Sequence, residues 1–320
     1  MADKQQQTGN LDALIEDDSP NASPNKIERV NHTPPPAKTA EMVYNETYSE
    51  AEQHDVNNIG VTIPDNETPI VILFGAPSMG KTMALLRLIR FFNEKYGTNA
   101  QSVVPEYVFR PESDIHYSAM CDRLNSLAYR DYAPGPTDII SFMLVKIYNN
   151  GVPVCQILEA PGEHYFDGSP EPHFPTYIHE IMGTPNKKIW VFFVEKGWGK
   201  NQNERDCYKR AIHGIGIKDG DDVVFLFNKA DKFRNQLHDD VAHFEREIEQ
   251  QYRGIFDPFR RTNRLEILMF GRDKYKKVCF SSGTFTRTQQ PDPDKAERWI
   301  PGTDNRYCEN FWNALDLPNK

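Results

Sequence analysis

The sequence predicts an α/β fold in which helices cover both faces of a mostly parallel sheet that contains one antiparallel strand. Apolar runs of strand length alternate with segments of helical period, the pattern of a parallel sheet covered on both faces. A glycine-rich turn joins the first apolar run directly to a helical segment. Asn149-Asn150-Gly151, between two strand-like runs, is a hairpin signal and makes one strand antiparallel.

The predicted elements lie within residues 67–320. We expect strands at 70–74, 139–148, 152–158, 189–194, 223–227 and 278–280. We expect helices from residue 80 onward, over 203–214, over a segment whose apolar face is Val241, Phe244, Ile248 and Tyr252, and near Phe311, Trp312 and Leu315. Residues 97–136, with a helix near 114–127, and residues 253–276 fit this pattern poorly and are expected to be insertions.

Residues 1–66 differ from the rest of the chain. They contain no Phe or Trp, and their twelve acidic and four basic side chains supply −8 of the total charge of −9. So polar a segment buries too little apolar surface to offset its chain entropy, which predicts a disordered acidic arm. A partner-binding role for the arm and a plain unstructured leader both remain open.

Composition also excludes several classes of function. No apolar run approaches the ~20 residues that span a bilayer, and the N-terminus has no secretory signal, so we expect a cytoplasmic protein without membrane insertion. Five scattered cysteines without a Cys-x-x-Cys pair indicate reduced core residues. An acidic chain without a basic stripe argues against nucleic-acid binding.

The first strand leads into a phosphate-binding loop. The loop reads Gly75-Ala76-Pro77-Ser78-Met79-Gly80-Lys81-Thr82. Its glycines let the backbone wrap so that several N–H groups point at one anion, and the helix that follows adds the positive end of its dipole. Lys81 is expected to reach the outer phosphates, and the Thr82 hydroxyl to ligate Mg²⁺.

The strand at 223–227 ends in Asn228-Lys229-Ala230-Asp231, which suits a guanine base. The Asp231 carboxylate can accept hydrogen bonds from the ring N–H and the exocyclic amine of guanine, whereas adenine lacks that donor pair. The Lys229 stem can lie along the ring, and Asn228 can tie this loop to the phosphate loop. Backbone N–H groups of Ser281 and Ser282, after the last strand, are expected to meet the guanine carbonyl, although a plain turn explains them almost as well.

Three further residues are candidates for the metal and the terminal phosphate. Glu159, at the end of the strand 152–158, can hold Mg²⁺ through a water opposite Thr82. The N–H of Gly162 can contact the terminal phosphate, because a glycine lets the backbone approach closely. The Thr137 hydroxyl can complete the Mg²⁺ shell, with an ordinary loop threonine as the alternative.

In this order, these motifs resemble those of Ras-like P-loop GTPases of the translation-factor-related class, and Glu159-Ala160-Pro161-Gly162-Glu163 resembles diverged prokaryotic signalling GTPases. The resemblance implies the P-loop NTPase sandwich, the cofactors GTP/GDP and Mg²⁺, and a switch in which Thr137 and the loop after Gly162 order around the terminal phosphate. Glu159 replaces the family's usual Asp. Glu163 stands where a water-positioning Gln or His is usual, so Glu163 and the neighbouring His164 are the catalytic candidates.

Three hypotheses of function remain open. The chain is a GTP-hydrolysing molecular switch, a GTP-binding regulatory module with little hydrolysis, or an ATPase or kinase of the P-loop class with Glu159 as its catalytic carboxylate. Either GTP-binding role calls for an effector or regulator protein as partner. The first two require that the loop beginning at Gly75 and the residues around Asp231 share one cleft.

Overall fold

The computed structural model describes residues 61–106, 121, 124, 126–132, 142–166, 174–233, 241–287 and 297–317. The expected acidic arm lies outside this part of the chain, except for its last six residues. Two of those six pack against the domain: Ile63 is buried, and the Asp65 carboxylate forms an ion pair of 2.7 Å with Lys146. The packed region therefore includes residues 61–66, and the character of residues 1–60 stays a prediction.

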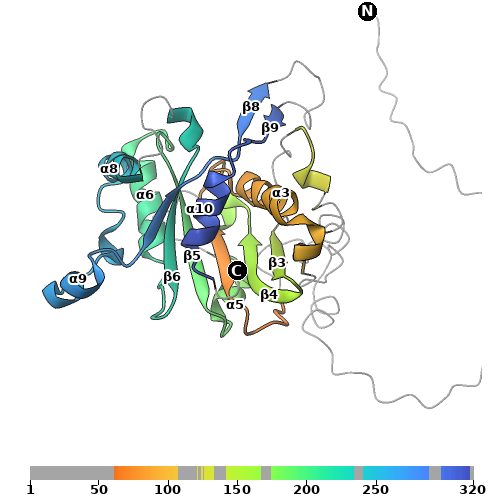
Figure 1. Cartoon of the computed structure of the whole chain (residues 1–320). Coiled ribbons are helices and arrows are strands. Elements are labelled where there is room, and N and C mark those ends of the chain that lie inside the picture. Colours follow the sequence, from red (N-terminus) through yellow and green to blue (C-terminus); the bar gives the residue numbers. More distant parts are fainter. Residues whose placement is uncertain are drawn as a thin grey trace, which may run out of the picture. The chain divides into compact units, whose positions relative to one another are not determined.

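Within the described residues, a seven-stranded sheet forms the centre of the domain, with the strand order β2-β3-β4-β1-β5-β6-β7 (Figure 1). The strands are β1 (Ile70–Phe74), β2 (Gln101–Pro105), β3 (Met143–Asn149), β4 (Val152–Glu159), β5 (Lys188–Glu195), β6 (Asp222–Asn228) and β7 (Lys276–Cys279). Only β3 runs against its neighbours, β2 and β4, while β4, β1, β5, β6 and β7 are parallel. This arrangement confirms the predicted fold class.

Helices cover both faces of the sheet (Figure 1). They are α3 (Lys81–Ala100), α5 (Thr176–Gly183), α6 (Gln202–His213), α8 (Val241–Gln251), α9 (Arg264–Phe270) and α10 (Arg306–Ala314). On one face α3 packs against α10, where the rings of Phe92 and Trp312 lie 4.7 Å apart. On the other face, the Tyr208 hydroxyl of α6 donates to the Phe193 carbonyl of β5.

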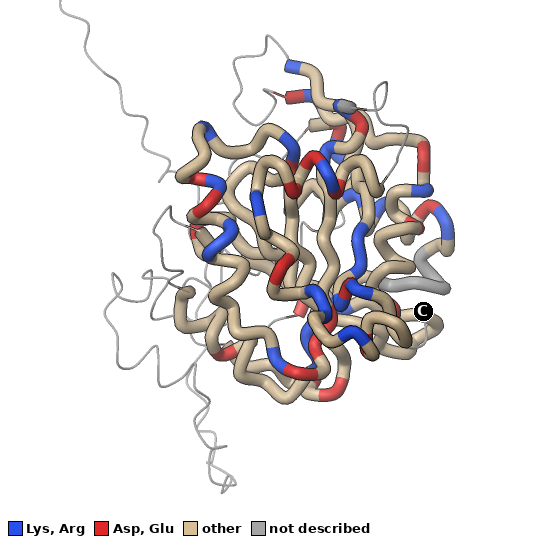
Figure 2. Tube along the Cα trace, turned by 90° about the vertical axis from the view of Figure 1, so that its left-hand side faces the viewer, with Lys and Arg blue, Asp and Glu red and all other residues tan. Residues whose placement is uncertain are grey.

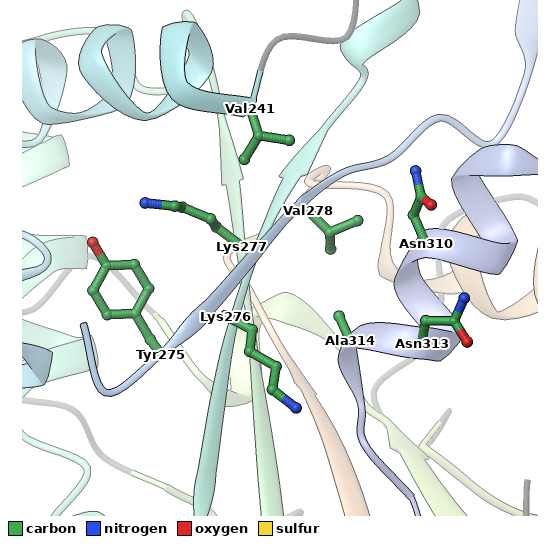
Figure 3. Close-up of a pocket in the computed structure, with 8 residues that line it drawn as sticks. All are labelled: Val241, Tyr275, Lys276, Lys277, Val278, Asn310, Asn313 and Ala314. Atoms are coloured by element: carbon green, nitrogen blue, oxygen red, sulfur yellow. The ribbon is translucent and has the colours of Figure 1, made fainter. Parts of the chain in front are cut away.

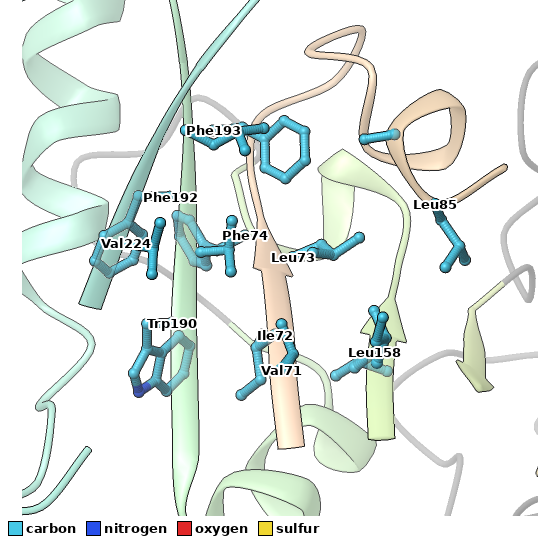
Figure 4. Close-up of a cluster of buried hydrophobic side chains, with 14 of the residues drawn as sticks. Val71, Ile72, Leu73, Phe74, Leu85, Leu158, Trp190, Phe192, Phe193 and Val224 are labelled. Carbon is cyan, nitrogen blue, oxygen red and sulfur yellow. The ribbon is translucent and has the colours of Figure 1, made fainter. Parts of the chain in front are cut away.

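The core lies along the central strands, where every residue of β1 and β5 is buried (Figure 4). Complete burial follows from the cover on both faces, and it explains why these strands read as continuous apolar runs. Phe74 shows the packing, because its ring lies 5.6 Å from that of Phe192 and 6.2 Å from that of Tyr208. Burial of one such side chain contributes about 1.5–3 kcal/mol to stability.

The predicted hairpin is present, and its turn has the expected chemistry. Asn150 and Gly151 have φ values of 50° and 78°, the left-handed region that a two-residue hairpin turn of the primed type requires. The helix from residue 80 and the strands at 189–194 and 223–227 are also confirmed, each within two residues of its expected bounds.

The two expected insertions contain two elements that periodicity did not predict, β2 and α9, together with helical backbone within the segment where a helix was expected, near 114–127. Residues 97–136 supply the edge strand β2, and helical backbone is present at 121, 124 and 126–128. Residues 253–276 supply α9, in which no residue is buried. Three of its apolar side chains are largely exposed, namely Leu265, Leu268 and Met269 at 70%, 84% and 72%. This apolar segment therefore lies on the surface.

A second, two-stranded sheet follows β7. It consists of β8 (Thr284–Arg287) and β9 (Glu297–Ile300), and the sequence analysis did not predict it. Trp299 anchors it: its ring is buried, and its Nε1 donates to the Ser282 carbonyl at 3.0 Å. Just after β9, the carbonyl of Gly302 accepts a hydrogen bond of 2.8 Å from the buried Arg87 guanidinium of α3.

Charges of both signs are interspersed over the described chain (Figure 2). All five cysteines are buried, and none forms a disulfide. In the part of the chain that the structure describes, no helix combines the length and apolarity needed to cross a bilayer.

Candidate nucleotide-binding site

The parallel strands end at one edge of the sheet, which is where α/β folds of this kind bind ligands. A cavity of about 810 Å³ lies at this edge. Most of the predicted site residues line it: Pro77, Ser78, Gly80, Lys81, Thr82, Glu159, Gly162, Glu163, Asn228, Lys229, Asp231 and Ser282. The loop that begins at Gly75 and the residues around Asp231 therefore share one cleft.

The phosphate loop wraps as its glycine and serine positions require. Ser78 and Gly80 have positive φ values of 63° and 82°, so the backbone reverses before α3 begins at Lys81. The Lys81 ammonium donates to the carbonyls of Gly75 at 2.8 Å and Ala76 at 3.4 Å, which places it inside the loop. The first N–H groups of α3 and the positive end of its dipole face the same region.

Lys81 is buried, and its electrostatic environment is unusual. Burial lowers the pKa of this ammonium to about 8, although the carboxylates of Glu159 and Glu163 act in the opposite direction. A charged lysine is therefore disfavoured where it lies, and a phosphate anion beside it would supply the missing counter-charge. This is the property expected of a residue that binds an anionic ligand.

The two predicted metal ligands in the described residues contact each other. The Thr82 hydroxyl donates to Glu159 Oε1 at 2.9 Å, and both side chains line the cavity. Burial raises the pKa of the Glu159 carboxyl, an effect that Lys81 and the Thr82 hydrogen bond partly offset. A cation at this position would stabilise the carboxylate form, and hydroxyl and carboxylate oxygens are ligands that Mg²⁺ accepts.

The Asn228 side chain joins the base loop to the phosphate loop, as the sequence analysis expects. Its Nδ2 donates to the Met79 carbonyl at 2.6 Å. The Lys229 ammonium donates to the Ser78 carbonyl at 3.1 Å and forms an ion pair of 2.6 Å with Glu195 at the end of β5. These contacts hold the Lys229 stem beside the cavity and fix the two loops relative to each other.

Asp231 lines the same cavity as the phosphate loop. Its Oδ1 accepts a hydrogen bond of 2.6 Å from the Ser281 hydroxyl, which orients the carboxylate. The backbone N–H of Ala230 donates to the Phe280 carbonyl, so the loops after β6 and β7 are joined as well. Ser281 supports Asp231 from behind, whereas Ser282 lines the cavity itself.

Gly162 approaches the phosphate loop so closely that no side chain would fit. A Cβ at this position would lie 2.5 Å from the carbonyl carbon of Ala76 and closer still to the backbone nitrogen of Pro77. Gly162 begins the short 3₁₀ helix Gly162–His164, which presents Glu163 to the cavity. The glycine thus allows the close approach of the two loops, while the expected contact of its N–H with a terminal phosphate stays a prediction.

His164 is a catalytic candidate that the structure does not bring into the cavity. It is buried, and its Nδ1 lies 2.6 Å from the Tyr177 hydroxyl of α5. Successive residues of a 3₁₀ helix point about 120° apart, so Glu163 and His164 face different ways. Thr137 lies outside the described residues. Three further predicted residues, Gly75, Met79 and Ser281, do not line the cavity but form the hydrogen bonds to Lys81, Asn228 and Asp231 given above.

The structure also brings residues to the cavity that the sequence analysis missed. They are Met83, Pro161, Lys232, Gly283, Thr284, Phe285 and Glu297. Most are neighbours of predicted positions, so an allowance of one or two residues would have included them. Phe285 and Glu297 belong to the unpredicted sheet of β8 and β9, and no sequence signal marked them.

A second hollow, of about 460 Å³, lies beside the edge strand β7, between α8 and α10 (Figure 3). It contains none of the predicted site residues. The Lys277 side chain in its wall is held by the carboxylates of Glu245 at 2.7 Å and Asp273 at 3.1 Å. This basic group is therefore neutralised within the fold.

Strand β1, the glycine-rich loop, and Lys81 and Thr82 at the start of α3 together define an α/β fold of the P-loop class. No protein-family model and no curated protein sequence matches the chain.

Solved structures do match. One is the putative nucleolar GTP-binding protein 1 of Plasmodium falciparum, at 14% identity and a TM-score of 0.34, over 70% of this chain and 81% of that one. A second is the GTPase-like domain of S. cerevisiae Ski7 bound to GDP and inorganic phosphate, at 12% identity and a TM-score of 0.36, over 71% and 47%. A third is the bacterial selenocysteine-specific elongation factor EF-Sec, at 13% identity and a TM-score of 0.31, over 78% and 28%. The chain spans less than half the length of the last two.

The lowered pKa of Lys81 predicts a pH-dependent affinity for phosphates. Below pH 8 the ammonium is charged and binds an anion, whereas above pH 8 the ligand-free lysine is neutral and must take up a proton on binding. We expect the Kd for inorganic tripolyphosphate to rise about tenfold per pH unit above pH 8. Calorimetric titration at pH 7, 8 and 9 measures it, and a Kd that stays constant over this range would contradict the assignment.

Proposed function

We propose that this chain binds guanine nucleotides and works as a Mg²⁺-dependent, GTP-hydrolysing molecular switch. The observation that carries the proposal is the hydrogen bond from Asn228 to the Met79 carbonyl, because it links the base loop to the phosphate loop across one cavity. A nucleotide whose phosphates lie at Lys81 would then extend toward Asp231. Within this proposal, the binding of a nucleotide as such depends only on the phosphate loop.

The preference for guanine depends on Asp231. This carboxylate is held by Ser281 and faces the cavity, so it would accept two hydrogen bonds from the N–H and amine of guanine. Adenine offers no such pair and would leave the partly buried carboxylate with the Ser281 hydroxyl but without a donor from the base, which costs about 1–3 kcal/mol. Guanine nucleotides are therefore the favoured ligand.

The Thr82 hydroxyl and the Glu159 carboxylate fit a magnesium ion. Because no group of three or more potential metal-binding side chains occurs among the described residues, a metal here would depend on phosphate oxygens and water for its remaining ligands. Mg²⁺ is commonly held in this way, through one or two side chains and the phosphates of its substrate. When bound, it would neutralise charge on the phosphates.

Whether bound GTP is hydrolysed depends on Glu163. Its exposed carboxylate lines the cavity, where it would orient or deprotonate a water but would also repel the terminal phosphate. That repulsion keeps a GTP-binding regulatory module with little hydrolysis as a second candidate. Release of phosphate from GTP in a single-turnover reaction supports the switch, and GTP that stays intact for hours supports the regulatory module.

The exchange Asp231→Asn tests the choice of base. An amide presents a donor where guanine also donates, so we expect the preference for GTP over ATP to fall about a hundredfold. Competition of each nucleotide against a fluorescent GTP analogue measures it. Asp219→Asn, at an exposed position that does not line the cavity, is the matched control and should leave the preference unchanged. Strong competition of wild-type protein by ATP at equal concentration would favour an ATPase or kinase instead.

As a switch, the protein would act in the cytoplasm on an effector or regulator protein. The regulator would be the source of any catalytic group that the cavity lacks, since activating proteins supply such groups to other GTPases.

A further inference from the structure

We propose that the sheet of β8 and β9 forms a wall of the base pocket, and that Phe285 stacks on the purine. The inference rests on the proposed function, because it adds an aromatic partner for the base at the same site. It names a role for an element that the P-loop pattern of the sequence does not contain.

The position of β8 follows from the base loop itself. Ser281 supports Asp231, Ser282 lines the cavity, and β8 begins two residues later at Thr284. Thr284 and Phe285 line the same cavity as Asp231 and Lys229. The chain therefore passes directly from the residues that would read the base to the residue that would cover it.

The pleat of the small sheet decides which of its side chains face the cavity. Phe285 pairs with Trp299, and Arg287 pairs with Glu297, so these four side chains share one face. Phe285 and Glu297 on this face both line the cavity, as does Thr284 at the start of β8. Glu297 lies 4.0 Å from Arg287, a pair that leaves the apolar ring of Phe285 as the surface suited to a base.

The wall is fixed to the domain rather than free to swing. Trp299 is buried, donates from its Nε1 to the Ser282 carbonyl, and lies under the guanidinium of Arg90, 5.9 Å from the ring centre. Gly283, with φ of 122°, packs so tightly that a Cβ would overlap the Ile300 carbonyl. A rigid wall holds its aromatic ring in place before the ligand arrives, which lowers the entropic cost of binding.

Phe285 is 41% exposed in this position, so part of its ring faces water. A purine would cover that surface, and stacking on an aromatic ring is favourable for every base because each has a π-face. The Lys229 stem, held by Ser78 and Glu195, supplies a second apolar surface at the same cavity. Phe285 therefore contributes affinity, whereas Asp231 contributes the choice of base.

The test compares Phe285→Ala with the matched control Phe270→Ala, an exposed phenylalanine on α9 that does not line the cavity. A fluorescent GDP analogue is titrated into the full chain, and GDP, ADP and base-free tripolyphosphate are used as competitors. We expect Phe285→Ala to weaken GDP and ADP about tenfold each, to leave their ratio unchanged, and to leave tripolyphosphate unchanged. Phe270→Ala should match the wild type.

Two results would overturn the inference alone. One is a Kd for GDP in Phe285→Ala that equals the wild-type value. The other is an equal loss of affinity for GDP and for tripolyphosphate in this variant, which would indicate a distorted phosphate loop. A wild-type protein that binds no nucleotide would overturn the proposed function, and this inference with it. Phe285→Tyr, which keeps the ring, should restore GDP affinity to within about twofold of the wild type.

Discussion

Lys81→Ala is expected to weaken nucleotide binding about a hundredfold or more while the domain stays folded. The exchange removes the buried ammonium that lies inside the phosphate loop and would donate charge-assisted hydrogen bonds to the outer phosphates. Loss of about 3 kcal/mol of such interactions corresponds to roughly this factor. Titration with a fluorescent nucleotide analogue measures the effect.

We expect Lys81→Ala to keep or slightly raise the stability of the fold, although it weakens nucleotide binding. Because burial lowers the pKa of Lys81, the charged group opposes folding at neutral pH, so the variant should unfold at the same temperature as the wild type or a slightly higher one. Lys187→Ala is the control, since Lys187 forms an exposed ion pair with Asp222 just before β5, at the opposite end of that strand from the cavity. Wild-type affinity in Lys81→Ala would contradict the assignment of the phosphate loop.

Gly162→Ala is expected to have the second large effect, because the added methyl group would occupy the place of phosphate-loop backbone. The atoms it meets belong to Ala76 and Pro77, which cannot rotate away as a side chain would. Forced overpacking of this kind typically costs about 1–3 kcal/mol. We expect a lower midpoint of unfolding together with weaker nucleotide binding.

The matched control is Gly183→Ala at the end of α5. Nothing lies within 4 Å of a Cβ at this position, and its φ is not in the left-handed region. Alanine favours a helix over glycine, so this variant should be neutral or stabilised by up to about 1 kcal/mol. If the two glycine variants behave alike in thermal unfolding and in nucleotide titration, the close approach of Gly162 has no functional importance.

Local sequence patterns were sufficient for every strand of the central sheet except β2, and for most of the cavity. Parallel strands that are buried on both faces are mostly apolar, so β1 and the interior of β5 can be recognised as continuous apolar runs. The loop after β1 needs a glycine at position 80 because its backbone takes a positive φ there. The residues that follow the strands share an edge for the same topological reason. The order of the motifs therefore allowed a contact between distant loops to be predicted, namely the hydrogen bond from Asn228 to the Met79 carbonyl.

Other features depend on contacts that no local pattern records. His164 follows Glu163 in the chain, yet the turn aims it at Tyr177 rather than at the cavity. The strands β8 and β9 are short and largely exposed, and a gap of nine residues separates them, so neither apolar periodicity nor turn chemistry marked them. The helix α9 was not predicted either: its segment was expected only as an insertion, and the fold leaves its apolar side chains exposed.

The Arg87 guanidinium has a consequence for any shortened version of the chain. It is almost fully buried on the helix that begins at Lys81, and its hydrogen bonds go to the Gly302 carbonyl and to Asn305 Oδ1 at 2.7 Å. Truncation after β9 would remove both acceptors and leave the buried Arg87 guanidinium without them, at a cost of several kcal/mol. The C-terminal residues therefore act as a structural support for the helix on which the phosphate loop is built.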